Sequence, residues 1–363
     1  MFGYPANMHN NTFVVEYLRY LESKLYLINS CGGPNERGNY QMDNKDMELK
    51  IIELFMKNLN INKENYWGYI TSGGTEGNYW GIKSGFDKFP NGILYFSSDA
   101  HYSVNKCVNS TYNMVYLNEK ISSDYGKIDT NDLLERCRKN WENNNRPAIL
   151  LLTWGTTKTG AIDDVSFIEE ELTKLNIPHY IHLDAALFGG IPNNQINSPA
   201  LLNFSSLNVD SVSISLHKYL GSTKVNGIVI SKNKSKGNYV DYIGQEDSTV
   251  LGSRDFLPFQ IYQRTLDLYE RANPNEYNEN INYFIEEATK NNLSFSRNDK
   301  SNIFIIKKPS DELCIKYQLA TFSDGINQYA HIILFPSHKK ENILLLITDI
   351  VKENNLEKSL YKC

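Results

Sequence analysis

The sequence predicts an α/β fold in which a mostly parallel central sheet forms a large domain and a smaller C-terminal α/β domain follows. Short apolar strands alternate with helical patterns from about residue 66 to 230, an order typical of βαβ units. Polar or glycine-rich motifs come just after several of these strands. Because ligands of such sheets bind at the C-terminal ends of the strands, the functional site is expected at that edge.

The expected strands of the large domain are short runs of apolar and β-branched residues bounded by polar or glycine-containing turns. They are residues 66–71, 93–97, 114–117, 148–153, 179–184, 211–214 and 227–230. In the small domain we expect strands at 303–306 and 331–335 and an amphipathic helix at 341–351.

The N-terminal part has an amphipathic pattern from Phe13 to Ile28 that predicts a packing helix. The Asn29 to Pro34 stretch breaks this pattern, and a second helix is expected from about Asp43 through Phe55. The expected division of the chain is an N-terminal segment at 1–45, a large domain at 46–254 and a small domain at 255–363.

Composition excludes several classes of protein. The formal net charge is -5, with no clustering of lysine and arginine, so neither nucleic acid nor an anionic membrane is an expected partner. No apolar run reaches the roughly 18 residues of a membrane span, and the first residues lack the pattern of a signal peptide, so a cytoplasmic location is expected. The 5 cysteines are widely spaced without a C-x-x-C pair, which predicts free thiols and no metal site.

The central motif is His217-Lys218, which follows the β-branched strand 211–214 and precedes Gly221-Ser222. A lysine at this place suits an amine held rigidly in a pocket, so Lys218 is a candidate Schiff-base lysine. The alternative is a surface lysine after an edge strand, and the neighbouring motifs decide between the two.

Three further motifs favour the pocket. Asp184 ends an apolar strand, where a buried carboxylate needs a cation such as a protonated pyridine nitrogen. The Thr71 to Asn78 stretch joins a strand to a helix and offers backbone N–H groups for an anion. His101 follows another strand, where its ring could lie on a flat cofactor. A dinucleotide site is excluded because the turn reads Gly-Gly-Thr-Glu-Gly, not G-x-G-x-x-G.

On these motifs the chain closely resembles the pyridoxal-phosphate-dependent group II amino-acid decarboxylases, within them the histidine decarboxylase and plant serine decarboxylase branch. The residues that carry the resemblance are Trp67 to Asn78, Ala100 to Val104, Gly155 to Thr157, Gly160 to Asp164, His182 to Ala186, His217-Lys218 and Gly252 to Arg254. The resemblance implies the fold-type-I transferase-like architecture, pyridoxal phosphate as the cofactor and a homodimer whose N-terminal segments clasp the partner subunit.

The resemblance also implies roles for single residues. Lys218 should carry the cofactor, Asp184 should hold its pyridine nitrogen protonated, and His101 should stack on its ring beside the substrate carboxylate. The remaining positions that match cofactor-binding residues are Gly74, Thr75, Ser215 and His217 at the phosphate, Thr156 and Ala186 near the ring, and Ser253 at the phosphate of the neighbouring subunit. For Thr156 an ordinary turn is an equal alternative.

Substrate identity stays open in the sequence. Branch resemblance favours L-histidine, serine is the nearest alternative, and a basic or an aromatic amino acid is a further one. The chain has Asp255-Phe256-Leu257 where relatives usually have Asn-Gly-His or similar, and the acidic Asp255 would favour a basic amino acid. Polar residues 231–251 are expected to form a mobile loop near the site, in which Tyr242 is a candidate donor of the α-carbon proton. The pocket for the substrate side chain is expected to be built from the Phe2 to Pro5 segment, this loop of one subunit or its neighbour, and the bend at Asp255. Another fold-type-I reaction, such as that of a lyase, an aminotransferase or an aldehyde synthase, and a non-catalytic relative are the remaining alternatives.

Overall fold

The structure, a computed structural model, describes most of the chain. The described residues are 1–8, 29–40, 42–62, 66–109, 118–199, 204, 207–234, 236–254 and 258–360, with side chains up to residue 355 in the last helix. The expected helix at 13–28, the expected strand at 114–117 and the Asp255 to Leu257 bend lie outside these residues.

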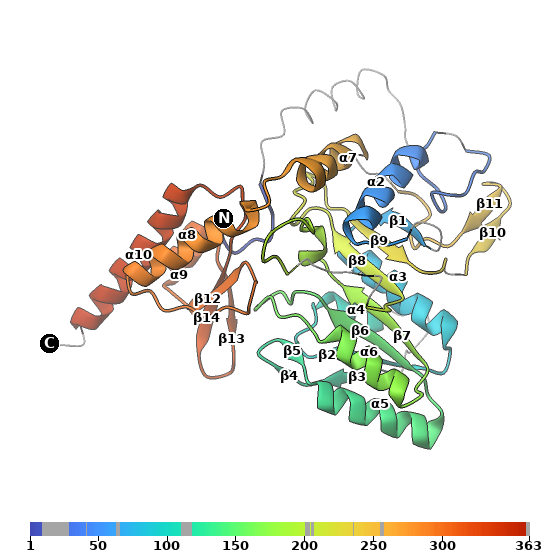
Figure 1. Cartoon of the computed structure of the whole chain (residues 1–363), viewed down its shortest axis with the longest axis horizontal. Coiled ribbons are helices and arrows are strands. Elements are labelled where there is room, and N and C mark those ends of the chain that lie inside the picture. Colours follow the sequence, from blue (N-terminus) through green and yellow to red (C-terminus); the bar gives the residue numbers. More distant parts are fainter. Residues whose placement is uncertain are drawn as a thin grey trace.

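The core of the molecule is a sheet of buried strands (Figure 1). Its strands are β1 Trp67–Thr71, β2 Ile93–Ser97, β3 Asn118–Ile121, β6 Ala148–Thr153, β7 His179–Asp184, β8 Ser211–Ser215 and β9 Gly227–Ser231. Their order in the sheet is β1-β9-β8-β7-β6-β2-β3. The strands from β8 to β3 in this order pair in parallel, and β9 runs antiparallel to both of its neighbours. The predicted α/β fold with a mostly parallel sheet is confirmed.

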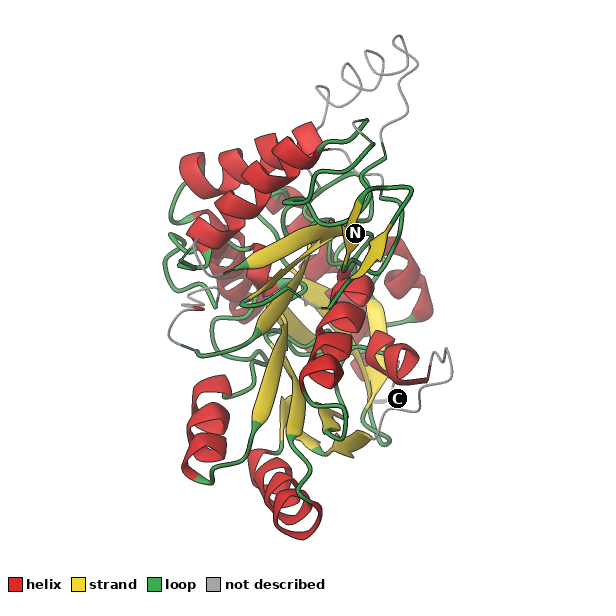
Figure 2. Cartoon of the chain, turned by 90° about the vertical axis from the view of Figure 1, so that its right-hand side faces the viewer, coloured by secondary structure: helices red, strands yellow, loops and turns green. Residues whose placement is uncertain are grey.

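Helices cover the sheet on both sides (Figure 2). They are α2 Lys45–Asn58, α3 Gly74–Lys88, α4 Ser103–Asn109, α5 Thr130–Asn144, α6 Val165–Lys174 and α7 Pro258–Leu266, with the short turns η2 Phe188–Gly190 and η4 Asp267–Arg271. A small ribbon of β4 Ser123–Asp124 and β5 Lys127–Ile128 lies between β3 and α5 in the chain. Because β2 and β6 are buried along their whole length, they are nearly continuous apolar runs in the sequence, whereas β3 at the edge of the sheet is mostly exposed and polar.

Helix α3 lies unusually close to the sheet, because glycines face β7 and β8. A Cβ atom on Gly81 would lie 2.1 Å from His182 Nδ1, and one on Gly77 would lie 2.7 Å from the Ser213 Cβ. No side chain larger than hydrogen fits at either position without moving the sheet residues. This close approach brings the polar side chains of α3 into contact with those of the two strands.

Residues 231–251 differ from the loop that their polar composition predicts. Around the undescribed residue 235 they contain a two-stranded antiparallel ribbon, β10 Asn238–Val240 and β11 Gln245–Asp247. Gln245 is buried, accepts a hydrogen bond from Lys45 Nζ at 3.0 Å and donates one to the Cys31 carbonyl at 2.7 Å. The ribbon is thus tied to residues 29–45.

The C-terminal part forms a smaller α/β unit, whose own sheet lies beside the large one (Figure 1). It contains α8 Glu276–Lys290, β12 Ile303–Lys307, α9 Asp311–Tyr317, β13 Ala320–Ser323, β14 Gln328–Ile333 and α10 Lys340–Leu360. The strands are antiparallel in the order β12-β14-β13. The predicted strand at 331–335 begins three residues earlier than expected, and the predicted helix at 341–351 continues to Leu360.

The first eight residues cross from this small sheet to the large one. The N–H of Phe2 donates to the Tyr317 carbonyl at 2.9 Å, and the Phe2 carbonyl accepts from Ile333 at 2.6 Å. Further along, the N–H of Asn7 donates to the Lys218 carbonyl at 2.9 Å. The N-terminus therefore packs on its own chain and reaches the turn that carries Lys218.

Candidate active site

One cavity of about 360 Å³ opens at the carboxyl ends of β1, β7 and β8 and beside the turn after β2. The structure brings eight of the predicted site residues together along its wall: Gly74, Thr75, His101, Asp184, Ala186, Ser215, His217 and Lys218. The other described side chains and backbone segments that line it are Tyr4, Ser72, Gly73, Glu76, Asn78, Tyr102, Ser103 and Val225. These residues lie far apart in the sequence and meet because their strands end at the same edge of the sheet.

Lys218 lies in the tight turn after β8. Its backbone N–H donates to the Ser215 carbonyl at 3.3 Å, and its own carbonyl is bonded to Asn7. Burial lowers the pKa of the Lys218 amine, and the Asp184 carboxylate opposes that shift. An amine with a lowered pKa is more often neutral, and the neutral form is the nucleophile.

Asp184 is the last residue of β7 and is only 4% exposed. Both of its carboxylate oxygens accept hydrogen bonds inside the protein: Oδ1 from the Ala186 N–H at 3.1 Å and Oδ2 from Asn78 Nδ2 at 2.7 Å. Neither donor carries a charge. A buried carboxylate with neutral partners keeps its negative charge available for a cation in the cavity that it lines.

His101 sits in the turn between β2 and α4. Its Nδ1 accepts from the Ser103 backbone N–H at 3.3 Å and lies 2.7 Å from the Ser103 hydroxyl, which places the ring proton of the neutral form on Nε2. Burial lowers the pKa of His101, the Asp184 carboxylate opposes the shift, and Lys218 adds to it. The ring is therefore a neutral plane at the cavity wall.

The opposite end of the cavity suits an anion. Helix α3 begins at Gly74, and its N-cap residue Gly73 has no side chain to satisfy the first backbone N–H groups. A Cβ atom on Gly74 would lie 2.6 Å from Ser215 Oγ, so a larger residue at this position would displace the Ser215 hydroxyl. The free N–H groups and the positive end of a 15-residue helix favour a phosphate here. His217 lines the same wall with its Nδ1 held by the Asn226 carbonyl at 3.0 Å.

Three predicted residues lie outside this cavity in their own chain. Thr156 is buried, and its hydroxyl contacts Thr159 Oγ1 at 2.9 Å and the Ala161 N–H at 3.0 Å, which is the turn role that the sequence left open. Ser253 is exposed and accepts from Asn29 Nδ2 at 3.1 Å. Tyr242 lies in the β10–β11 turn and is 71% exposed.

One contributor was not singled out from the sequence, and a second comes from a segment that was expected at the substrate pocket. Asn78 lies four residues after Gly74, so it shares the face of α3 that meets the sheet, and this spacing was a usable signal. Tyr4 belongs to the Phe2 to Pro5 segment that was expected at the substrate pocket, and it does line the cavity. It is held there because Phe2 and Gly3 are bonded to Tyr317, Gln318 and Ile333.

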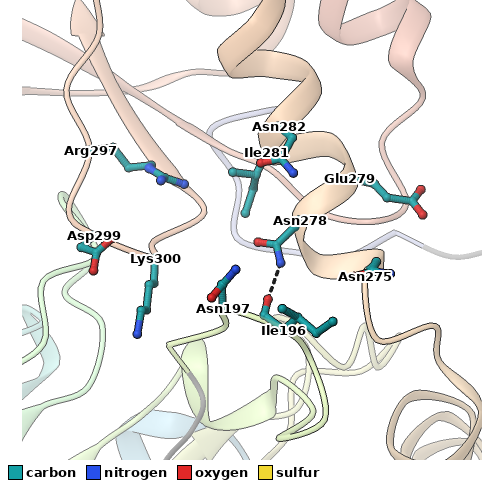
Figure 3. Close-up of a pocket in the computed structure, with 10 residues that line it drawn as sticks. All are labelled: Ile196, Asn197, Asn275, Asn278, Glu279, Ile281, Asn282, Arg297, Asp299 and Lys300. Carbon is teal, nitrogen blue, oxygen red and sulfur yellow. Dashed lines mark hydrogen bonds between the residues drawn. The ribbon is translucent and has the colours of Figure 1, made fainter.

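A second cavity, of about 420 Å³, lies between residues 196–197, α8 and the 297–300 loop (Figure 3). Its polar side chains Asn197, Glu279, Asp299 and Lys300 are exposed, and Glu279 points away from the pair Asp299 and Lys300. None of the predicted site residues lines it. We therefore place the chemistry in the cavity around Lys218.

Comparison with known proteins shows the family of the chain. Residues 89–288 match the pyridoxal-dependent decarboxylase conserved domain, and the chain belongs to that family. The protein is thus a pyridoxal-phosphate-dependent amino-acid decarboxylase.

Several relatives with similar sequences are histidine decarboxylases. It is 32% identical to the histidine decarboxylase of Pseudomonas entomophila (strain L48), over 97% of this chain and 86% of that protein, and 33% identical to the histidine decarboxylase of Solanum lycopersicum, over 97% and 84%. The crystal structure of L-methionine decarboxylase from Streptomyces sp. 590 superposes with a TM-score of 0.80 at 19% identity, covering 97% of this chain and 92% of that one. This last likeness shows the fold.

The residues of the cavity fit the family's cofactor. An uncapped helix start beside a close-packed glycine suits its phosphate, a buried carboxylate suits its pyridine nitrogen, and a desolvated amine suits its aldehyde. Bound pyridoxal phosphate supplies an acceptor for the electron pair that remains when carbon dioxide leaves.

Proposed function

We propose that this decarboxylase converts L-histidine to histamine and carbon dioxide. The proposal is supported by relatives named histidine decarboxylase, which are 32% or 33% identical over nearly the whole chain. The observation that carries it is the single cavity in which Lys218, Asp184 and His101 meet beside the start of α3. The N-terminal Tyr4 reaches the same cavity and is available to contact a substrate side chain.

Each predicted residue that lines the cavity has a proposed role. Lys218 anchors the cofactor through its amine, Asp184 holds the proton on the pyridine nitrogen, and His101 lies against the ring and orients the substrate carboxylate. Gly74, Thr75, Ser215 and His217 hold the phosphate, and Ala186 packs against the ring. These tasks need no movement of the sheet, because all eight residues already line one space.

A screen of carbon dioxide release over the standard amino acids and ornithine, with added pyridoxal phosphate, tests the substrate. Histidine should give the highest kcat/KM, by about 100-fold or more over serine, because an imidazole and a hydroxymethyl differ in size and hydrogen bonding. A higher kcat/KM for serine, lysine, ornithine or arginine would overturn the proposed substrate while leaving the decarboxylase assignment in place. Release from no amino acid at all would contradict both.

We also propose that the protein works as a homodimer with composite sites. Support comes from Ser253 and Tyr242, which are exposed and lie outside the cavity of their own chain, where a neighbouring subunit can use them. Tyr242 is then available to a neighbouring cavity as donor of the α-carbon proton. The N-terminal clasp of the partner stays a prediction, because residues 9–28 lie outside the described part.

Light scattering on the purified protein should give about twice the chain mass of 41.7 kDa. Ser253→Ala should weaken cofactor binding without changing this mass, because it removes one hydroxyl from the predicted phosphate contact across the subunits. A fully active monomer, or a Ser253→Ala variant with unchanged cofactor affinity, argues against the composite site.

A cytoplasmic location is the last part of the proposal. Among the described residues no helix combines the length and the apolar character that crossing a membrane requires. Cys31, Cys107, Cys137 and Cys314 have free thiols, which is usual in reducing compartments. Fractionation of cells that express a tagged chain should recover it in the cytosolic fraction, and recovery with membranes would contradict the proposal.

A further inference from the structure

A series of buried, hydrogen-bonded polar side chains extends from Asp184 into the protein, and it begins at Asn78, which also lines the cavity. It runs from Asn78 on α3 through His182 on β7 to Ser211 on β8 and back to Tyr180 on β7. These four residues are each at most 4% exposed. Polar groups in the middle of a sheet are costly unless every one is paired, so the arrangement needs an explanation.

The direction of each hydrogen bond follows from Asp184. An ionised carboxylate can only accept, so the amide of Asn78 must turn its Nδ2 toward Asp184, at 2.7 Å. The Oδ1 atom of Asn78 then accepts from the Ser213 hydroxyl at 2.5 Å and from His182 Nε2 at 3.1 Å. The imidazole of His182 therefore carries its proton on Nε2.

The hydrogen bonds from His182 to Ser211 and Tyr180 run in the same direction. Burial lowers the pKa of His182 to about 4, against the opposing effect of the Asp184 carboxylate, so the ring is neutral and its Nδ1 must accept. Nδ1 lies 2.7 Å from the Ser211 hydroxyl, which must donate to it. The Ser211 oxygen in turn lies 2.8 Å from the Tyr180 hydroxyl and accepts from it. Every donor in this series of hydrogen bonds points toward Asp184.

We propose that Asn78 and His182 are positioning residues that fix the Asp184 carboxylate against the pyridine nitrogen of the cofactor. The inference rests on the proposed contact of Asp184 with that nitrogen. Hydrogen bonds to the charged form of a carboxylate favour that form. Because the donors are a neutral amide and a neutral imidazole, they stabilise the charge without cancelling it, which an arginine or a protonated histidine would do.

Two glycines of α3 leave the space that these buried polar side chains occupy. Gly81 makes room for the imidazole, since a Cβ there would lie 2.1 Å from His182 Nδ1. Gly77 lets α3 approach Ser213, so that Asn78 reaches both strands at once. With the ring held in this space and Asn78 bonded at both ends, the Asp184 carboxylate has one available orientation.

The test uses holoenzyme reconstituted with pyridoxal phosphate labelled with ¹⁵N in the ring, whose protonation is read by solid-state NMR. His182→Phe keeps a flat aromatic ring but removes the donor to Asn78, and Asn78→Leu removes the contact with Asp184. Both variants should move the ¹⁵N signal toward the unprotonated position and lower kcat by about 10- to 100-fold with little change in KM, as for other residues that orient a functional ligand. His182→Gln should keep most of the protonated signal, because its Nε2 can donate to Asn78 as the histidine does.

His179→Phe is a matched control, because it removes a histidine from the same strand at a place that does not line the cavity. It should leave the ¹⁵N signal and kcat unchanged. If His182→Phe also leaves the ¹⁵N signal and kcat unchanged and only lowers Tm, the buried polar residues have a structural role only, and the inference is overturned.

Two further variants distinguish a failure of this inference from a failure of the proposed Asp184 contact and from a failure of folding. An unchanged ¹⁵N signal in Asp184→Asn would refute the proposed contact of Asp184 itself, and the inference with it. If His182→Phe does not fold, Tyr180→Phe replaces it as the test, since it removes only the outermost hydroxyl. Tyr180→Phe should shift the signal in the same direction by a smaller amount, and no shift in that variant would then overturn the inference.

Discussion

Lys218→Ala should yield a folded protein that loses turnover by at least about 10³-fold, the scale expected when a covalent catalytic group is removed. The substitution deletes the amine at the centre of the cavity and leaves the start of α3 and the Asp184 carboxylate in place. Carbon dioxide release should fall to background, and the absorbance band of the lysine-bound cofactor near the visible edge should disappear. Circular dichroism and Tm should stay close to those of the unaltered protein.

Lys290→Ala is the control for this prediction, because Lys290 lies at the exposed end of α8, outside the cavity. It should keep both the absorbance band and the turnover. Carbon dioxide release at the unaltered rate by Lys218→Ala would show that another group anchors the cofactor.

Asp184→Asn should bind the cofactor but lower kcat by about 10²- to 10³-fold, the usual effect of losing one electrostatic contact at a reacting centre. The reason is that a neutral amide cannot hold a proton on the pyridine nitrogen. The amide also has a single acceptor oxygen, whereas the carboxylate accepts from both Asn78 Nδ2 and the Ala186 N–H, so one of these two contacts must rearrange. Single-turnover measurements with histidine should place the loss in the chemical step.

Asp184→Glu is the companion variant, because it keeps the charge and moves the carboxylate by one methylene. It should lie between the unaltered protein and Asp184→Asn in kcat. If Asp184→Asn has an unaltered kcat, the pyridine nitrogen does not depend on this carboxylate.

The parallel strands could be predicted well because their signal is local. β2, β6 and β7 begin and end at the predicted residues, since a strand buried on both faces is a continuous apolar run between polar turns. The β10–β11 ribbon has no such signal. Its strands are short and largely exposed, and what orders them is the contact of Gln245 with Lys45, two hundred positions away in the sequence.

The same distinction applies to the site. Residues directly after a strand, such as Asp184 and Lys218, could be placed at the sheet edge by topology alone. Thr156 also follows a strand, but its hydroxyl bonds to the Ala161 N–H within its own turn, and residue order cannot tell these two uses apart. Asn78 was missed because its role depends on how closely α3 approaches the sheet, which follows from Gly77 and Gly81.

The pairing of Phe2 with the C-terminal part of the chain has a consequence for the order of folding. Its backbone partners are Tyr317 and Ile333, which lie more than three hundred residues further along the chain. Contacts of such long sequence separation form late, because a large loop must close before they are gained. The bond from Asn7 to the Lys218 carbonyl and the cavity wall at Tyr4 are therefore expected to form late in folding, after the elements that they join.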